Sequence, residues 1–143
     1  MTKSLQVLLR DAHTAVYSEV QAEVTRAGYS DLNPGHHIVL RNLGENGARP
    51  SELAVEAGVT RQAITKVVDD LVRRGVVRRD PDAEDGRGVI VRYTDRGLEG
   101  LGVARRHMDA MEAGFAARVG AERWAQVRTT LEELFGNSAP IDM

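Results

Sequence analysis

The chain has 143 residues, with 19 Lys and Arg against 21 Asp and Glu, and 42% of its residues are hydrophobic. This length suits one ordinary domain and excludes a large multidomain enzyme. The lack of cysteine excludes disulfide scaffolds, thiolate zinc sites, iron–sulfur clusters and cysteine redox switches. The sequence contains neither a run of ~18 apolar residues nor a signal-peptide core, so we expect a cytoplasmic protein that does not bind membranes.

The charge is unevenly distributed along the chain. The formal net charge is -2, which argues against a protein that coats nucleic acid indiscriminately. Residues 60–79 are nevertheless locally basic, with only Asp69 and Asp70 as acidic residues, and the two ends of the chain are mildly acidic. The basic side chains of this segment are Arg61, Lys66, Arg73, Arg74, Arg78 and Arg79. We expect Asp69 and Asp70 to cap a helix or to pair with Arg73 or Arg74.

The first half of the chain predicts three helices. Apolar residues recur at helical spacing over residues 5–24 and predict one long amphipathic helix. Asn33-Pro34 predicts the start of a second helix, because asparagine can cap it and proline at the first helical position loses no hydrogen bond. Arg49-Pro50 opens a short third helix, which Gly58 ends in a left-handed turn.

A fourth helix, over residues 61–74, begins after Thr60 as its N-cap. At 100° per residue, Ile64, Val67, Val68 and Leu71 share one side, and polar and basic residues share the other. The pattern predicts one face packed in the core and one polar outer face.

A β-hairpin and two more helices are predicted after Gly75. The β-rich segments 76–79 and 89–93 flank a long polar loop, which is typical of a hairpin. Thr94-Asp95 caps a fifth helix, and Gly120 separates it from a sixth.

A short helix, a glycine-containing turn and a helix with a partly basic outer face form a helix-turn-helix, and the hairpin makes it a winged one. Such a second helix fits the DNA major groove, where arginine or lysine pairs with guanine and glutamine with adenine. The predicted base-reading residues are Thr60, Arg61, Gln62, Thr65 and Lys66. The predicted DNA-backbone and wing residues are Arg73, Arg74, Arg78, Arg79, Asp85 and Arg87. Of these, Arg87 could enter a narrow minor groove, and Asp85 is expected to orient the loop by pairing an arginine.

Several motifs between Leu32 and Leu98 resemble the MarR family of bacterial transcriptional regulators. They are Glu52-Leu53-Ala54, Val59-Thr60-Arg61-Gln62-Ala63-Ile64-Thr65, Val68-Asp69-Asp70-Leu71, Arg74-Gly75-Val76-Val77-Arg78-Arg79, Asp82, Asp85-Gly86-Arg87 and Tyr93-Thr94-Asp95-Arg96-Gly97. In that family the loop usually reads Asp-Arg-Arg, so Gly86 replaces the middle arginine, while Asp85 and Arg87 match.

The resemblance implies a mainly α fold with a small β-hairpin wing and long N- and C-terminal dimerisation helices. One domain, 1–143, would contain a DNA-binding lobe at 32–97 and a dimerisation layer at 1–28 and 98–143. The partners would be double-stranded DNA, carrying a pseudo-palindromic operator, and a second copy of the chain. Candidate dimer contacts are Leu5, Leu8, Val119, Trp124, Val127, Leu131, Leu134 and Phe135.

The family also binds small molecules between these helices, so the resemblance implies a possible small-molecule effector, phenolic or anionic, that releases a repressor from DNA. Plain core packing explains the candidate pocket residues about equally well. They are Val16, Tyr17, Val20, His37, Leu40, Arg41, Met108 and Met111.

Two other functions stay open: a winged-helix module that docks an acidic protein partner, and a zinc-responsive regulator using His13, His36, His37 and His107. The histidine spacing does not match a clear metal site, so we expect no bound metal and no cofactor. No catalytic motif is present, and we expect no enzyme activity.

Overall fold

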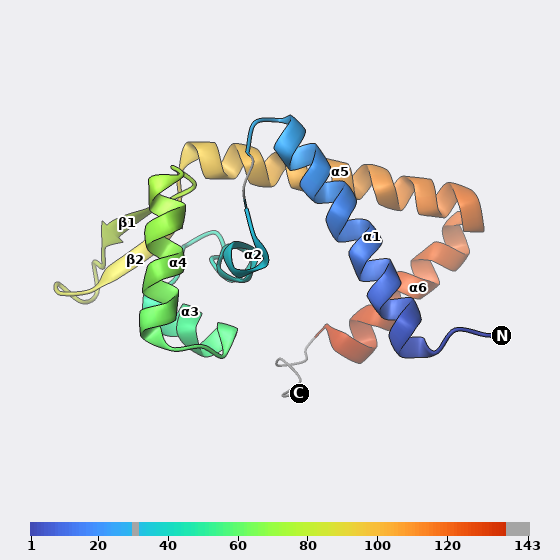
Figure 1. Ribbon diagram of the computed structural model, residues 1–143, viewed down its shortest axis with the longest axis horizontal. Coiled ribbons are helices and arrows are strands. Elements are labelled where there is room, and N and C mark those ends of the chain that lie inside the picture. The colour runs from blue at the N-terminus through green and yellow to red at the C-terminus, as the bar shows by residue number, and fades with distance from the viewer. Residues whose placement is uncertain (30–31, 137–143) are drawn as a thin grey trace. The chain divides into compact units, whose positions relative to one another are not determined.

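A computed structural model describes residues 1–29 and 32–136, in which the chain has six helices and one two-stranded hairpin (Figure 1). The chain divides into two compact units. Residues 25–102 form the central unit, and residues 1–24 with the described residues from 103 onward form the terminal unit. This mainly α architecture with a hairpin confirms the predicted fold class.

The first two helices of the central unit begin where the sequence predicts. The α2 helix (Pro34–Arg41) has Asn33 as its N-cap, and the Asn33 side chain accepts a hydrogen bond of 3.0 Å from the His36 amide. The α3 helix (Pro50–Ala57) starts at a proline and ends at Gly58, whose φ of 64° is the left-handed conformation that glycine adopts without strain.

The α4 helix (Arg61–Arg73) follows directly. The Thr60 hydroxyl accepts a hydrogen bond of 3.1 Å from the Ala63 amide, which confirms Thr60 as the N-cap. Ile64, Val68 and Leu71 are buried, as the helical pattern predicts. This face fixes the helix in the core and leaves its opposite face outside.

The strands β1 (Val77–Pro81) and β2 (Val89–Tyr93) pair antiparallel, with Val77 opposite Tyr93 and Pro81 opposite Val89. The first strand therefore begins one residue later and ends two residues later than predicted. Ala48 forms an additional antiparallel bridge with Val91, which ties the hairpin to the chain before α3. The core of the central unit gathers residues from α2, α3, α4 and the hairpin: Val39, Leu43, Ala48, Leu53, Ala54, Ile64, Val68, Leu71, Val76, Val77 and Val91.

The α5 helix (Asp95–Val119) begins in close contact with the chain before β1. The Thr94 hydroxyl donates to the carbonyl of Gly75 and accepts a 3.0 Å hydrogen bond from the Gly97 amide. A Cβ atom at Gly97 would lie 2.0 Å from the Val76 carbonyl oxygen, so only glycine fits there. This packing gives a physical reason why threonine and glycine stand at the two ends of Thr94-Asp95-Arg96-Gly97.

The terminal unit consists of α1 (Leu5–Arg26) as far as Val24, α5 from Val103 onward, and α6 (Ala121–Phe135). Trp124 packs on Phe115 with ring centroids 4.9 Å apart, and its indole nitrogen donates to Glu112. No residue of α6 is buried, in contrast to the compact core of the central unit.

Candidate DNA-binding surface

The α3 helix, the turn at Gly58 and the α4 helix form the predicted helix-turn-helix. The turn is closed by a hydrogen bond of 3.1 Å from the Val59 amide to the Ala54 carbonyl. Leu53 and Ala54 of α3 are buried in the same core as Ile64 of α4. The core thus holds α4 in a fixed orientation with its polar face directed outward.

The N-terminal half of α4 presents unpaired polar side chains. Arg61, Gln62, Thr65 and Lys66 are all exposed. In residues 1–29 and 32–136, neither Arg61 nor Lys66 forms an ion pair, and the Gln62 amide makes no hydrogen bond. The Thr65 hydroxyl donates to the Arg61 carbonyl at 2.9 Å, which leaves its oxygen as an acceptor. These groups are therefore available to a ligand.

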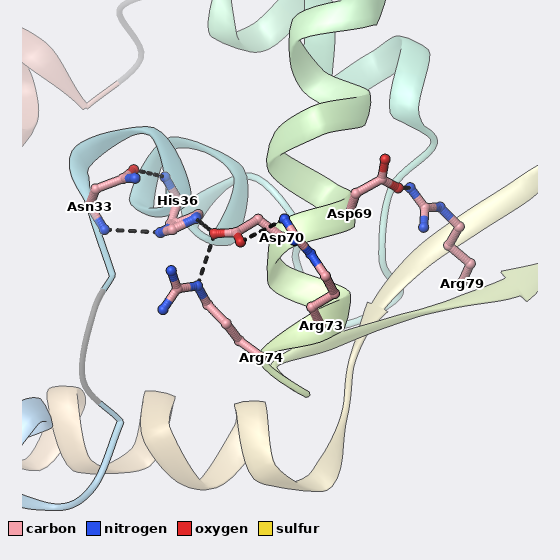
Figure 2. Close-up of polar contacts among 7 residues, drawn as sticks. All are labelled: Asn33, His36, Asp69, Asp70, Arg73, Arg74 and Arg79. Atoms are coloured by element: carbon pink, nitrogen blue, oxygen red, sulfur yellow. Dashed lines mark hydrogen bonds and ion pairs between the residues drawn. The ribbon is translucent and has the colours of Figure 1, made fainter.

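The C-terminal end of α4 has the opposite arrangement, as Figure 2 shows. Asp70 accepts hydrogen bonds from Arg73 at 3.0 Å and from Arg74 at 2.9 Å. The same carboxylate lies 2.6 Å from the His36 ring. The hydrogen bond from Arg74, helped by the one from His36, holds the pKa of Asp70 below its ordinary value, although partial burial opposes this. The expected pairing of Asp70 with these arginines is confirmed.

His36 connects this carboxylate to the start of α2. Its Nδ1 atom accepts a hydrogen bond of 2.9 Å from the Asn33 amide, and its side chain is only 3% exposed. A nitrogen that accepts carries no proton, so the ring is neutral and its Nε2–H donates to Asp70. The histidine thus joins the N-terminus of α2 to the C-terminal end of α4.

The remaining arginines predicted to contact phosphates are also paired with carboxylates. Arg79 donates to Asp69, and Arg78 donates to both oxygens of Asp80 at 3.0 Å. All four of the predicted backbone arginines therefore have a carboxylate partner, whereas the cations of the N-terminal half of α4 have none among the described residues.

The loop of the hairpin carries the predicted wing residues. The Asp85 carboxylate accepts from the backbone amide of Arg87 at 3.2 Å. We expected Asp85 to pair with an arginine side chain, but it forms no ion pair in the described part of the chain. Its carboxylate instead shapes the turn by accepting from the backbone amide two residues further on. Arg87 is exposed, and its guanidinium forms no ion pair in the described part of the chain.

A second buried carboxylate anchors the base of this loop. The Asp82 side chain is 5% exposed and accepts from Arg49 at 2.6 Å and from the Glu84 amide at 3.0 Å. The Arg49 guanidinium, followed by the Glu84 amide, holds the pKa of Asp82 below its ordinary value. Because Arg49 immediately precedes α3, this pair ties the wing to the helix-turn-helix.

Sequence reasoning missed the roles of His36 and Arg49. The bonds His36–Asp70 and Arg49–Asp82 join residues 34 and 33 positions apart. The third position of α2, where capping-box side chains reach back to the N-cap, was an available signal for the contact of His36 with Asn33, but not for the first of these two bonds. No local pattern indicated the second.

The predicted effector residues fall in both units. Val16, Met108 and Met111 of the terminal unit line an open groove of about 410 Å³ with Phe115 and Trp124. Tyr17 stacks on His13, with centroids 5.9 Å apart, and Val20 is half-buried. The other three predicted residues belong to α2 in the central unit: His37, Leu40 and Arg41. Of these, Leu40 packs against the core, and burial lowers the pKa of His37.

No group of three or more histidine, aspartate or glutamate side chains that could hold a metal ion occurs within residues 1–29 and 32–136. His107 lies 3.3 Å from Glu19, and His36 is engaged by Asp70. No helix in the described part of the chain has the length and apolar character needed to span a bilayer.

Comparison with known proteins supports the resemblance to the MarR family. A MarR family model matches residues 30–88, which include the helix-turn-helix and most of the wing. Over these residues the chain is similar to the MarR family. A transcriptional regulatory protein for the hcr operon of Thauera aromatica is 29% identical over 125 residues, which cover 86% of this chain and 74% of that protein. These findings support a transcriptional regulator whose DNA-binding fold is similar to that of the MarR family.

Solved structures of MarR-family regulators agree with the observed fold. The transcriptional regulator Tm0710 from Thermotoga maritima is 25% identical, with a TM-score of 0.66 and coverage of 92% of this chain and 91% of that one. The repressor CouR, solved with a 23-mer DNA duplex, is 24% identical, with a TM-score of 0.68 and 92% coverage of both chains. The predicted resemblance to the MarR family and the winged-helix architecture are thus confirmed.

Proposed function

We propose that this protein is a homodimeric repressor that reads a pseudo-palindromic operator with the N-terminal half of α4. The observation that carries this proposal is the exposed group of Arg61, Gln62 and Lys66, which has no ion-pair or hydrogen-bond partner for its side chains in the described residues. It lies directly after a helix-turn-helix turn, where recognition helices contact base edges.

The chemistry of these side chains suits base recognition. Arginine and lysine donate to the O6 and N7 acceptors of guanine, and glutamine can make paired hydrogen bonds to adenine. Thr65 can contact a thymine methyl group or accept a hydrogen bond through its oxygen. Thr60, as N-cap, sets where this half of the helix begins.

The wing would add a contact outside the major groove. Arg87 extends from a loop shaped by Asp85 and anchored by Asp82. A narrow minor groove has enhanced negative potential, which favours an inserted arginine. The sequence also predicts phosphate contacts by Arg73, Arg74, Arg78 and Arg79. Each of these guanidinium groups is paired with a carboxylate and would have to leave it to bind a phosphate, so these contacts are not part of the proposal.

The terminal unit supports the proposed homodimer. Burial of apolar surface drives association, yet α6 has no buried residue and α1 has only Val24. Seven of the eight predicted dimer contacts are exposed in the single chain, from 41% to 70% of their surface. They are Leu5, Leu8, Val119, Val127, Leu131, Leu134 and Phe135. A second copy that covers these side chains would remove them from water and place two α4 helices on one DNA duplex.

Release by a small phenolic or anionic ligand completes the proposal. Such a ligand must bind more tightly to the dimer that does not fit the operator, with a coupling free energy of ~1–3 kcal/mol. The candidate contacts stay those predicted from the sequence: Val16, Tyr17, Val20, His37, Leu40, Arg41, Met108 and Met111.

Selection from a pool of random-sequence duplexes tests the function. We expect enrichment of a two-fold symmetric sequence whose half-site centres are ~34–36 Å apart, since each protomer would place one α4 helix in a major groove. Binding to this sequence should resist unrelated competitor DNA. A pool that shows no enrichment, or binding that unrelated DNA abolishes, would contradict the proposal and favour a protein-docking module.

A further inference from the structure

We propose that Asp70 is a specificity-determining residue that restrains Arg73 and Arg74 and so prevents them from adding sequence-independent phosphate contacts. The inference rests on the proposed function, because it concerns how selectively the protein binds DNA beside the N-terminal half of α4, which is called the reading half below. Asp70 would thus reduce the number of phosphate contacts, whereas a phosphate-binding residue increases it.

Both oxygens of the Asp70 carboxylate are occupied. Oδ1 accepts from Arg73 at 3.0 Å, and Oδ2 accepts from the Nε atom of Arg74 at 2.9 Å. Figure 2 shows the two guanidinium groups directed toward this carboxylate from the last turn of α4. One negative charge therefore partly compensates two positive charges at the end of the recognition helix.

His36 fixes the carboxylate in place from a different helix. Its Nε2–H donates to Oδ2 at 2.6 Å, while its Nδ1 accepts from the Asn33 amide at 2.9 Å. Because the ring is neutral, it orients Asp70 without cancelling its charge. Asp70 thus cannot follow an arginine that turns toward DNA, and its side chain is only 28% exposed.

Moving Arg73 or Arg74 to a phosphate would therefore have a cost. It would leave a partly buried carboxylate with fewer hydrogen-bond donors. The same carboxylate would also repel the approaching phosphate. The pairing consequently favours arginines that stay on the protein, and leaves the DNA contacts of α4 to its N-terminal half, which carries Arg61, Gln62 and Lys66.

The consequence for DNA binding is selectivity. Each phosphate contact strengthens binding to every sequence and steepens the dependence of log K on log salt concentration by ~0.9. A regulator must find its operator among a large excess of non-specific sites, so fewer such contacts raise the ratio of specific to non-specific binding.

The variant Asp70→Asn tests this proposal, because asparagine keeps the shape and can still accept from His36 but lacks the charge. The matched control is Glu45→Gln, which removes one negative charge from an exposed residue of the same unit that forms no ion pair in the described part of the chain. Binding of a fluorescent duplex of scrambled sequence is measured by anisotropy over a series of salt concentrations.

We expect Asp70→Asn to steepen the slope of log K against log salt concentration by about one to two. The same variant should bind the scrambled duplex about tenfold more tightly at low salt. Glu45→Gln should keep the slope of the unmodified protein. Adding Arg73→Gln and Arg74→Gln to Asp70→Asn should restore that slope. An unchanged slope in Asp70→Asn, or a steeper one that these two replacements do not reverse, would overturn the proposal.

A second variant needs no change at Asp70. Arg73→Gln with Arg74→Gln in the otherwise unmodified protein should alter the slope by less than about 0.5, because Asp70 already engages both arginines. A slope flattened by about 1.8 would show that both bind phosphates, and would overturn the proposal. Circular dichroism confirms that each variant is folded. If the unmodified protein selects no operator, the proposed function fails; if it does and these slopes disagree, only this inference fails.

Discussion

The N-terminal half of α4 and its C-terminal end are both rich in cationic side chains, but only the C-terminal end pairs them with carboxylates. Arg61 and Lys66 have no acidic partner among the described residues, whereas Arg73 and Arg74 share Asp70. Basic residues in a sequence therefore do not all contribute equally to a basic surface. Unpaired cations can bind a ligand without first breaking an ion pair, so the reading half of α4 should dominate DNA binding.

Charge reversal in the reading half should have the largest effect. Arg61→Glu would replace a potential donor to guanine with a group that DNA repels, and we expect operator affinity to fall by a factor of about 100 or more. The measurement is a mobility shift with the selected operator and competitor DNA. Arg105→Glu, the same reversal at an exposed position in the terminal unit, is the control and should bind nearly normally. Full specificity in Arg61→Glu would remove α4 as the recognition helix.

The wing offers a test between an unpaired and a paired arginine. Arg87→Ala should weaken operator binding about tenfold, because an unpaired cation is lost. It should also flatten the slope of log K against log salt concentration by ~0.9. Arg78→Gln should change affinity less than about threefold, since Arg78 is already bound to Asp80. Equal losses in the two variants, measured by anisotropy, would mean that pairing does not decide which arginines bind DNA.

A smaller effect is expected from the carboxylate that anchors the wing. Arg49 lowers the pKa of Asp82 in the folded protein, so the charged carboxylate stabilises the fold at neutral pH. As the pH falls below the ordinary value of 3.8 and through the lowered value, this contribution is lost. Asp82→Asn should therefore be less stable than the unmodified protein at pH 7, with a difference that shrinks under acidic conditions. Urea unfolding over a pH series checks this, and a difference independent of pH would contradict it.

The sequence predicted local structure well because its signals act over a few residues. Asn33, Thr60 and Gly58 cap or end helices through contacts within one turn, and each does so in the structure. The spacing of Ile64, Val68 and Leu71 correctly indicated the buried face of α4.

Predictions that depended on tertiary contacts were less complete. The basic segment 60–79 gave no sign that His36 of α2 would approach Asp70, or that Arg49 would reach the wing. Asp85 was expected to pair with an arginine side chain, but it binds a backbone amide two residues away. Charge patterns locate arginines along a helix, while their partners are decided by how distant segments pack.

Repeating the duplex selection with Gln62→Ala tests most directly whether the reading half of α4 contacts bases. Glutamine can specify adenine, and alanine cannot make those hydrogen bonds. We expect a consensus that relaxes at one symmetry-related position in each half-site and is retained elsewhere. A consensus identical to that of the unmodified protein would contradict it.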